Sequence, residues 1–343
     1  DYDRYLDEAG EQVAAGMIYW RNTLKLPTRY EMLFNEPLSG NRELVNGNTQ
    51  NVVDLVKRVG HRLRREGFAD TKFVIPNEET EEQSLATATA ILADPVARHY
   101  VGAIGYHPYP YGSIYSSVSN ILNTSGQGKP DPSRILIRQR LRDLGKQYGI
   151  PVWMTEVSHG GVNPLSFDAL RARAIHIHDE LVYADAAAYF GMNNMWDTVS
   201  QKAHSRSANL LSPANEGAIV FIDTGRQVVY ISGMGYAIGH YARWVKRGAV
   251  RIDGTSANPL IQVTAFEDDN KKRLVLVLIN NMTADSNLNV KVNGVTLTGH
   301  ILGEQSTDAA AWQSLAPVAP TSSSTINVRL PALSVTTIVG PIQ

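Results

Sequence analysis

Residues 30–37 read YEMLFNEP, and residues 151–158 read PVWMTEVS. Each segment is a short run rich in apolar and aromatic residues, the composition of a buried strand. Each run also ends on a carboxylate, Glu36 in the first and Glu156 in the second. Acidic residues at the carboxyl ends of buried strands are typical of parallel sheets, which build their sites at those ends. The two segments therefore favour a parallel α/β fold.

The remainder of the chain up to about residue 247 alternates between helical and strand patterns. Apolar residues spaced by three and four predict helices at 4–24, 52–63, 80–99, 131–148, 166–185 and 229–246. Short β-rich runs between them predict strands at 30–36, 72–78, 101–110, 151–158 and 187–196. Repeated strand–helix units of this kind predict a (β/α) TIM-type barrel.

The strand count of this predicted barrel is incomplete. A closed barrel has eight strands, whereas the sequence shows five strand–helix units preceded by a single helix at 4–24. An open five-stranded sheet would expose an unpaired edge and its apolar side. The sequence leaves two explanations open: the first three units lie upstream of residue 1, or self-association or a partner chain covers the gap.

The pattern changes after about residue 247. The runs LIQVTAFED, KRLVLVLINN, LNVKVNGV, STINVRLP and LSVTTIVG are strand-like and are separated by turn residues, with no helical spacing between them. Such short alternating strands predict an antiparallel β-sandwich. We therefore expect two domains, an N-terminally incomplete barrel at 1–247 and a sandwich at 248–343. The sandwich has few aromatic residues, which favours a supporting role over glycan binding.

Composition excludes several classes of function. The net charge is −1, and no basic stripe is present for phosphate neutralisation, so we expect no nucleic-acid partner. The longest apolar run, LVLVLI at 274–279, is far shorter than the roughly 20 residues that a membrane span requires. Cysteine is absent, which removes disulfides and thiolate chemistry. The chain shows no signal peptide, and we expect a secreted or periplasmic protein whose export signal lies upstream.

A barrel would bring the two carboxylates into one pocket. If three strands precede the visible ones, Glu36 and Glu156 lie on the fourth and seventh strands, which face each other across the barrel mouth. Two carboxylates in one pocket can cleave a glycosidic bond, one as a protonated acid and the other as an ionised nucleophile. Retaining enzymes hold the pair roughly 5–5.5 Å apart, and inverting enzymes roughly 6.5–9.5 Å apart.

These residues carry a family resemblance. Asn35-Glu36-Pro37 at one strand end, with Trp153-Met154-Thr155-Glu156 three units later, resembles the retaining glycoside hydrolases of clan A. The sequence is most similar to glycoside hydrolase family 30, because VYISGMGYAIGHYARWVKRGAVRI at 229–252 looks like that family's junction between barrel and sandwich. The resemblance covers roughly residues 28–343. It implies a carbohydrate substrate, no cofactor and no metal.

The resemblance also implies residue roles. Glu36 would be the acid/base and Glu156 the nucleophile. It assigns substrate-binding or positioning roles to four further residues: Asn35, His107, Tyr109 and Trp196. Asn35 would hydrogen-bond the sugar 2-hydroxyl, Tyr109 would hold the nucleophile ionised and aimed, and Trp196 would stack beneath the sugar ring.

Each assignment has a structural alternative. Both glutamates could be surface carboxylates in loops, the YHPYPY run around His107 could be an aromatic loop packing on itself, and Trp196 could belong to the core. For Asn77-Glu78 we favour the start of a polar loop over a place in the cleft. His159 is either a sugar-binding residue or a solvated loop histidine.

A metal site at His176-x-His178-Asp179 is disfavoured. Two histidines that lie two residues apart on a helix point to different faces, whereas helical zinc pairs are typically spaced i, i+4.

The sequence therefore predicts a retaining β-glycoside hydrolase. The alternative is a catalytically impaired carbohydrate-binding barrel, either a fragment or a pseudoenzyme without the first three strands. β-Xylosides, β-glucosides, β-galactosides and β-fucosides all fit the family, and endo or exo action is left open. Residues 197–227 lack the Arg/Tyr-rich segment of the family's glucuronoxylan-specific branch, which disfavours that substrate.

Overall fold

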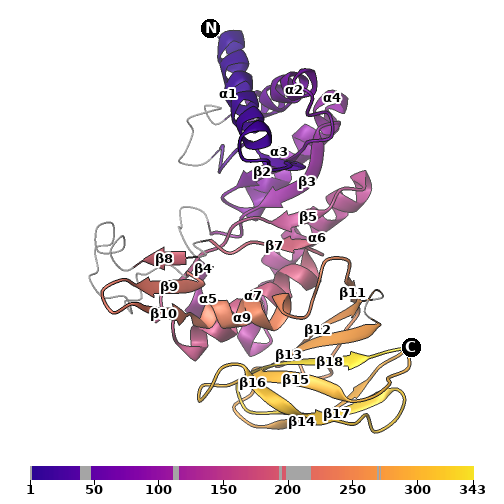
Figure 1. Ribbon diagram of the computed structural model, residues 1–343. Helices are drawn as coiled ribbons and strands as arrows, with labels where there is room; N and C mark the ends of the chain where they lie inside the picture. The colour runs from indigo at the N-terminus through magenta and orange to yellow at the C-terminus, as the bar shows by residue number, and fades with distance from the viewer. Residues whose placement is uncertain are drawn as a thin grey trace. The chain divides into compact units, whose positions relative to one another are not determined.

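The computed structural model describes residues 2–38, 48–110, 116–192, 195–197, 218–268, 270 and 272–343 (Figure 1). The chain forms two compact units. Unit 1 comprises Asp1–Ile114, Ser133–Val157 and Tyr183–Phe190, and unit 2 comprises Tyr115–Pro132, Ser158–Val182 and Gly191–Gln343. The predicted domains, residues 1–247 and 248–343, are continuous segments, whereas these units are each made of several segments. The domain boundary stays a prediction.

A parallel sheet forms the centre of unit 1. Its five strands follow the order β1-β2-β3-β5-β7 and all pair in parallel. The strands are β1 (Tyr30–Met32), β2 (Lys72–Glu78), β3 (Val101–Tyr106), β5 (Val152–Met154) and β7 (Ala188–Tyr189). The helices of this unit are α1 (Tyr2–Asn22), α2 (Thr49–Arg65), α3 (Glu81–Ala93), α4 (Pro95–Arg98) and α6 (Pro132–Tyr148). The predicted fold class, a TIM-type barrel followed by a sandwich, is confirmed.

Local sequence explains how these elements form. The apolar stripe of α2, including Val52, Val56 and Leu63, is buried in the core of unit 1. Thr80 and Gln83 form a capping box that starts α3 directly after β2. That helix start fixes the place where the chain turns away from the carboxyl end of β2.

The first strand of the sheet is an edge. Among the described strands β1 pairs with β2 alone, and Tyr30 and Met32 are 45% and 44% exposed. The helix before it, α1, carries further exposed aromatic side chains, Tyr2 and Tyr19, and it packs on α2 through buried Leu6 and Met17. The incomplete barrel at residues 1–247 stays a prediction.

The antiparallel sandwich lies in unit 2. Its larger sheet has the order β11-β12-β13-β18-β15-β16, and a smaller sheet pairs β14 with β17 (Figure 1). The strands are β11 (Val250–Ile252), β12 (Ile261–Asp268), β13 (Arg273–Asn280), β14 (Ser286–Lys291), β15 (Ile301–Ser306), β16 (Gln313–Val318), β17 (Thr325–Leu330) and β18 (Ser334–Pro341). Alternate apolar residues such as Leu276, Val328 and Ile338 form its core.

Unit 2 also contains smaller elements outside the sandwich. They are β4 (Ser116–Ser117), α5 (Val118–Asn123), η1 (Ser125–Gln127), β6 (His159–Gly160), α7 (Phe167–Tyr183), β8 (Met195–Asp197), β9 (Val220–Asp223), β10 (Val228–Ile231) and α9 (Gly233–Ala242). Strands β8, β9 and β10 form a separate three-stranded sheet, and β4 pairs with β6.

Two predicted elements need correction. The helix predicted at 229–246 begins only at Gly233, because the β-branched run at 228–231 forms β10 and the Ser232 hydroxyl then caps the helix by accepting the Gly235 N–H. The strand predicted at 187–196 is two strands, β7 and β8, which belong to different sheets. Periodicity alone could not separate them, since both parts are short and apolar.

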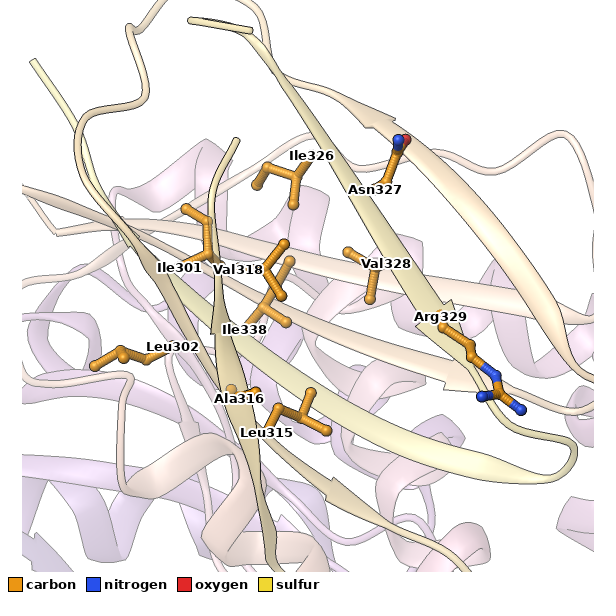
Figure 2. Close-up of a pocket in the computed structure, with 11 residues that line it drawn as sticks. Ile301, Leu302, Leu315, Ala316, Val318, Ile326, Asn327, Val328, Arg329 and Ile338 are labelled. Carbon is orange, nitrogen blue, oxygen red and sulfur yellow. The ribbon is translucent and has the colours of Figure 1, made fainter. Parts of the chain in front are cut away.

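An apolar pocket of about 180 Å³ opens in the sandwich (Figure 2). Its walls come from β15, β16 and β18 on one side and from β17 on the other, with Ile301, Leu315 and Ile338 facing Ile326 and Val328. Its lining includes no aromatic side chain. The lining includes two polar side chains, Asn327 and Arg329.

None of the helices in the described ranges is both long enough and apolar enough to cross a bilayer.

Candidate active site

The acid/base candidate lies just beyond the end of β1. Strand β1 ends at Met32, and the chain continues through buried Phe34 to Glu36, which has a left-handed φ of 51°. The Glu36 N–H donates a 2.8 Å hydrogen bond to the carbonyl oxygen of Asn77, at the end of β2. Because a non-glycine residue adopts this backbone conformation only when its surroundings impose it, the loop that carries Glu36 is held in place by the neighbouring strand.

Glu36, His107 and Glu156 come together in unit 1. The His107 Nδ1 lies 2.9 Å from Glu36 Oε1 and 3.9 Å from Glu156 Oε1. One oxygen of each glutamate and the His107 nitrogen all lie within 4.8 Å of one another. Residues separated by 120 positions along the chain thus place their carboxylates in one group, as the parallel sheet predicts.

Tyr109 contacts the second glutamate. Its hydroxyl donates a 3.2 Å hydrogen bond to Glu156 Oε1, and its ring packs edge-on against His107. His107 and Tyr109 are both buried, whereas the side chains of Glu36 and Glu156 are 18% and 25% exposed. Two carboxylates that remain accessible above buried supporting groups can meet a substrate from solvent.

The segment at 77–81 connects all four of these side chains to the end of β2. The Asn77 carbonyl accepts the Glu36 N–H, and the Asn77 side-chain oxygen accepts the Thr155 hydroxyl at 2.8 Å, one residue before Glu156. The carbonyl of Glu78 accepts the His107 N–H at 3.1 Å, and that of Glu79 accepts the Tyr109 N–H at 3.2 Å. We refer to residues 77–81 below as the bracing segment.

The interpretation of Asn77-Glu78 as the start of a polar loop is wrong. Both side chains are buried, and Asn77 has a left-handed φ of 58°. The Asn77 amide also donates to the Val74 carbonyl at 2.9 Å, which closes a turn at the strand end. Gly105 on β3 is required beside it, because a Cβ at that position would collide with the Asn77 side chain.

Buried charges further along the bracing segment fix the loop between His107 and Tyr109. The fully buried Glu81 pairs with Arg134 and Arg138, each at 2.9 Å. Arg134 in turn donates to the carbonyl of Pro108 at 2.5 Å. A buried carboxylate paired with two guanidinium groups avoids the large penalty of an unpaired buried charge, and the paired arginine holds the His-Pro-Tyr backbone.

Glu78 is the group near this site whose acidity is most changed. Burial raises the pKa of Glu78 to about 7, and the nearby negative charge of Glu36 acts in the same direction. Hydrogen bonds from the Leu38 N–H and the Thr87 hydroxyl, and the nearby His107, oppose the rise in this pKa. Neither its burial nor these contacts could be read from the tripeptide Asn-Glu-Glu.

The other predicted residues have different outcomes. The Asn35 side chain is exposed next to Glu36 in the chain. Trp196 lies on β8, and its side chain falls outside the described residues. The solvated alternative for His159 is wrong, because this histidine is fully buried in unit 2 against His176. Burial, with the nearby charge of Arg173, holds the pKa of His159 well below its usual range.

The histidines of α7 have separate partners. His176 Nε2 lies 3.1 Å from Glu180 Oε1, whereas His178 Nδ1 lies 2.8 Å from the Thr264 hydroxyl on β12. Within the described ranges, the group that comes close enough to surround a cation is Glu36, His107 and Glu156. The same three side chains suit proton transfer and nucleophilic attack, which require no metal.

The sequence is similar to a known protein family and to a curated enzyme. Residues 248–338 match the glycosyl hydrolase family 30 β-sandwich domain. Glucuronoxylanase XynC of Bacillus subtilis (strain 168) is 30% identical over 206 residues, which cover 57% of this chain and 40% of the relative. The chain therefore spans about two-fifths of the length of this curated relative.

Solved structures show the same fold at lower identity. A GH30 endoxylanase from Clostridium papyrosolvens C71 superposes with a TM-score of 0.71 at 18% identity, covering 99% of this chain and 72% of the other. The endo-beta1,6-glucanase BT3312 superposes with a TM-score of 0.63 at 18% identity, covering 97% and 63%.

The fold class is a TIM-type barrel with an added β-sandwich. The resemblance to glycoside hydrolase family 30 is confirmed, and it rests on the match of residues 248–338 to that family's β-sandwich domain and on the similarity to the curated glucuronoxylanase.

Proposed function

We propose that this chain carries the active site of a retaining β-glycoside hydrolase, with Glu36 as the acid/base and Glu156 as the nucleophile. The observation that carries the proposal is the approach of the two carboxylates, whose oxygens lie within 4.8 Å of each other in one group with His107. This separation is nearer the roughly 5–5.5 Å of retaining enzymes than the roughly 6.5–9.5 Å that leaves room for a water in inverting ones.

The reaction proceeds in two displacements. In the first, Glu156 attacks the anomeric carbon while the carboxylic acid of Glu36 gives its proton to the departing glycosidic oxygen, which leaves a covalent glycosyl-enzyme. In the second, the Glu36 carboxylate takes a proton from water, and the resulting nucleophile displaces Glu156 from the sugar. Glu36 thereby regains its proton and Glu156 its charge.

In this scheme His107 supports the acid/base and Tyr109 supports the nucleophile. The imidazole contacts Glu36 at 2.9 Å and fixes the direction of the acid/base carboxyl. The Tyr109 hydroxyl donates to Glu156 at 3.2 Å and orients its carboxylate. Asn35, exposed beside Glu36, remains the proposed contact for the sugar 2-hydroxyl, and Trp196 remains the proposed ring platform.

The substrate is a β-linked oligo- or polysaccharide, with xylan as the first polymer to test. A glucuronoxylanase is among the curated relatives, and xylanases and a β-1,6-glucanase are among the structural neighbours. Residues 197–227, which lack the Arg/Tyr-rich segment of the glucuronoxylan-specific branch, lie largely outside the described residues. Secretion and self-association also remain proposals.

The function is tested by screening aryl β-glycosides and a polysaccharide panel that includes xylan, glucuronoxylan and β-1,6-glucan. On the best aryl substrate, Glu156→Ala should remove nearly all turnover while leaving the circular dichroism spectrum unchanged. Azide should partly restore turnover of this variant and yield an α-glycosyl azide, because azide then attacks from the vacated face. For Glu36→Ala, azide should yield the β-linked product.

The alternative of a non-catalytic barrel makes a different prediction. Calorimetry with the same oligosaccharides would then show binding, while the wild-type chain would hydrolyse none of the panel. Wild-type turnover in Glu156→Ala without azide would remove the nucleophile assignment.

A further inference from the structure

We propose that Glu78 is a positioning residue that holds the acid/base loop, residues 35–38, in its working conformation. The inference rests on the proposed function of Glu36, and it extends that function to a buried carboxylate that does not itself reach the substrate. The connection is one hydrogen bond, from the Leu38 N–H to Glu78 Oε2 at 3.0 Å.

The acid/base loop needs an external support. Glu36 has a φ of 51°, in the left-handed region that side-chain-bearing residues seldom adopt. Such a conformation persists only where surrounding contacts impose it. Two hydrogen bonds flank the strained residue: its own N–H donates to the Asn77 carbonyl at 2.8 Å, and the Leu38 N–H donates to Glu78. Of these two acceptors, only Glu78 Oε2 belongs to a side chain.

Glu78 is itself held in place by burial and by hydrogen bonds. Its side chain is fully buried at the end of β2, and its second oxygen accepts the Thr87 hydroxyl of α3 at 3.1 Å. Its backbone carbonyl accepts the N–H of His107 at 3.1 Å. One residue therefore holds the loop of Glu36 with its side chain and the strand end of His107 with its backbone, and these two side chains meet at 2.9 Å.

The Glu78 carboxyl can accept the Leu38 N–H both protonated, as it is below its pKa of about 7, and ionised, because either form keeps an acceptor oxygen. A backbone N–H that donates to a carboxylate makes a charge-assisted hydrogen bond, which is shorter and stronger than a bond between neutral groups. Burial raises the pKa of Glu78, whereas the Leu38 hydrogen bond lowers it. This contact therefore favours the ionised carboxylate, which is the stronger acceptor. A glutamine would keep the acceptor oxygen and lose the charge, and an alanine would lose both.

Kinetics with two leaving groups test the proposal. A misplaced acid slows cleavage of a poor leaving group, such as an unsubstituted phenol, far more than that of dinitrophenolate, which departs without a proton. General acid–base catalysis is typically worth about 10²–10⁴-fold. Glu78→Ala should therefore lower kcat/KM for the phenyl glycoside by about 10- to 100-fold, and for the dinitrophenyl glycoside by less than about threefold.

Two further variants serve as comparisons. Glu78→Gln should recover most of the phenyl glycoside activity, because its amide oxygen still accepts the Leu38 N–H. Glu82→Ala removes an exposed carboxylate four residues along the chain, in the first turn of α3, and should leave both substrates unaffected. Equal losses of kcat/KM on both leaving groups in Glu78→Ala would point to a general structural defect and overturn the proposal.

Hydrogen exchange gives a test that needs no turnover. In the full chain, the Leu38 amide should lose protection in Glu78→Ala and keep it in Glu78→Gln and Glu82→Ala. If the Leu38 amide is equally protected from exchange in Glu78→Ala, the proposed role of Glu78 is overturned, even if the enzyme is active. If the wild-type chain hydrolyses no substrate, the proposed function fails on its own, and the exchange result still decides whether Glu78 holds the loop.

Discussion

Two left-handed, non-glycine residues lie next to each other at the candidate site. Glu36 and Asn77 have φ values of 51° and 58°, and the N–H of the first donates to the carbonyl of the second. Strained backbone of this kind collects at functional sites, where the surrounding structure holds a side chain in a position that relaxed backbone would not give. Here the Glu36 carboxyl lies 2.9 Å from the His107 Nδ1.

The Tyr109 hydroxyl should contribute directly to turnover. Hydrogen bonds to charged groups are worth about 1.5–3 kcal/mol, which corresponds to about a 10- to 150-fold change in rate. We therefore expect Tyr109→Phe to lower kcat/KM on an aryl β-glycoside by a factor in this range, with the fold unchanged. Tyr5→Phe is the matched control, because its buried hydroxyl on α1 has no hydrogen-bond partner within the part of the chain that the structure describes. Equal activity in both variants would contradict the role of Tyr109.

Glu78 should make stability fall as pH rises. Its pKa is about 7 in the folded chain and near 4.5 as a free side chain. The folded state therefore keeps a proton that the unfolded state loses, so the stabilisation is complete below pH 4.5 and is lost progressively as pH approaches 7. The total is on the order of 3 kcal/mol.

Glu78→Gln removes this titration. Denaturant unfolding of unit 1 should be measured between pH 4.5 and pH 8. The free energy of unfolding of Glu78→Gln should increase relative to that of the wild type as pH rises. A constant difference across this range would contradict the raised pKa.

The sequence identified some of these residues and missed others for a physical reason. Glu36, Glu156, His107 and Tyr109 stand at strand ends in recognisable motifs, and the structure brings them together. Glu78 was missed because its importance comes from a hydrogen bond to the backbone of Leu38, 40 residues earlier. Every residue except proline has a backbone N–H, so the identity of residue 38 does not indicate this hydrogen bond.

At the scale of elements, α9 and the sandwich are joined by close packing. The indole of Trp312 lies where a Cβ on Gly239 would be, and its Nε1 donates to the Tyr236 carbonyl at 3.2 Å. Glycine costs roughly 0.5–1 kcal/mol in a helix relative to alanine, yet here it permits the indole to reach the helix backbone.

Gly239→Ala should therefore destabilise unit 2. The added methyl group must displace a large ring, and overpacking of this kind typically costs about 1–3 kcal/mol. Gly16→Ala on α1 is the matched control, because among the described residues no atom beyond its chain neighbours and the backbone of its own helix lies within 4 Å of the added Cβ. That variant should gain up to about 1 kcal/mol from helix propensity. Thermal unfolding of both variants measures the two effects, and stabilisation by Gly239→Ala would contradict the packing.

Long periodic elements were easier to predict than short ones. Helices α1, α2, α6 and α7 agree with their predicted ranges to within a few residues. Strands β11, β15 and β16 were missed, and β10 was assigned to a helix. Those strands contain three to six residues, too few to establish a clear alternation, and each is held by pairing with another strand. Tertiary pairing therefore decides their structure more than local preference does.

At the scale of the whole molecule, each unit contains a buried group that makes its stability depend on pH, and these two groups act in opposite directions. Unit 1 contains Glu78, which loses stabilisation as pH rises. Unit 2 contains His240, whose pKa burial lowers to about 3 and whose ring nitrogens contact Thr337 and Ser306. A histidine buried in its neutral form stabilises above pH 6.5, and this stabilisation is lost as pH falls towards 3.

Mild acid should consequently weaken unit 2. With an unfolded pKa of 6.5, the loss at about pH 5 is on the order of 2 kcal/mol. Hydrogen exchange of peptides from β12 and β13 at pH 7 and at pH 5, corrected for intrinsic exchange rates, should show this loss in wild type and a smaller one in His240→Gln. Equal protection at both pH values would contradict the lowered pKa.

The central claim is that Glu156 forms a bond to the sugar while Glu36 serves as acid and base. The most direct test is to incubate the chain with a dinitrophenyl 2-deoxy-2-fluoro-β-glycoside of the preferred sugar, which slows release of the glycosyl-enzyme, and to locate the label by peptide mass spectrometry. We predict one fluoroglycosyl group, attached to Glu156 and absent from Glu156→Ala. A label on Glu36, or hydrolysis of ordinary substrates with no label at all, would contradict the account.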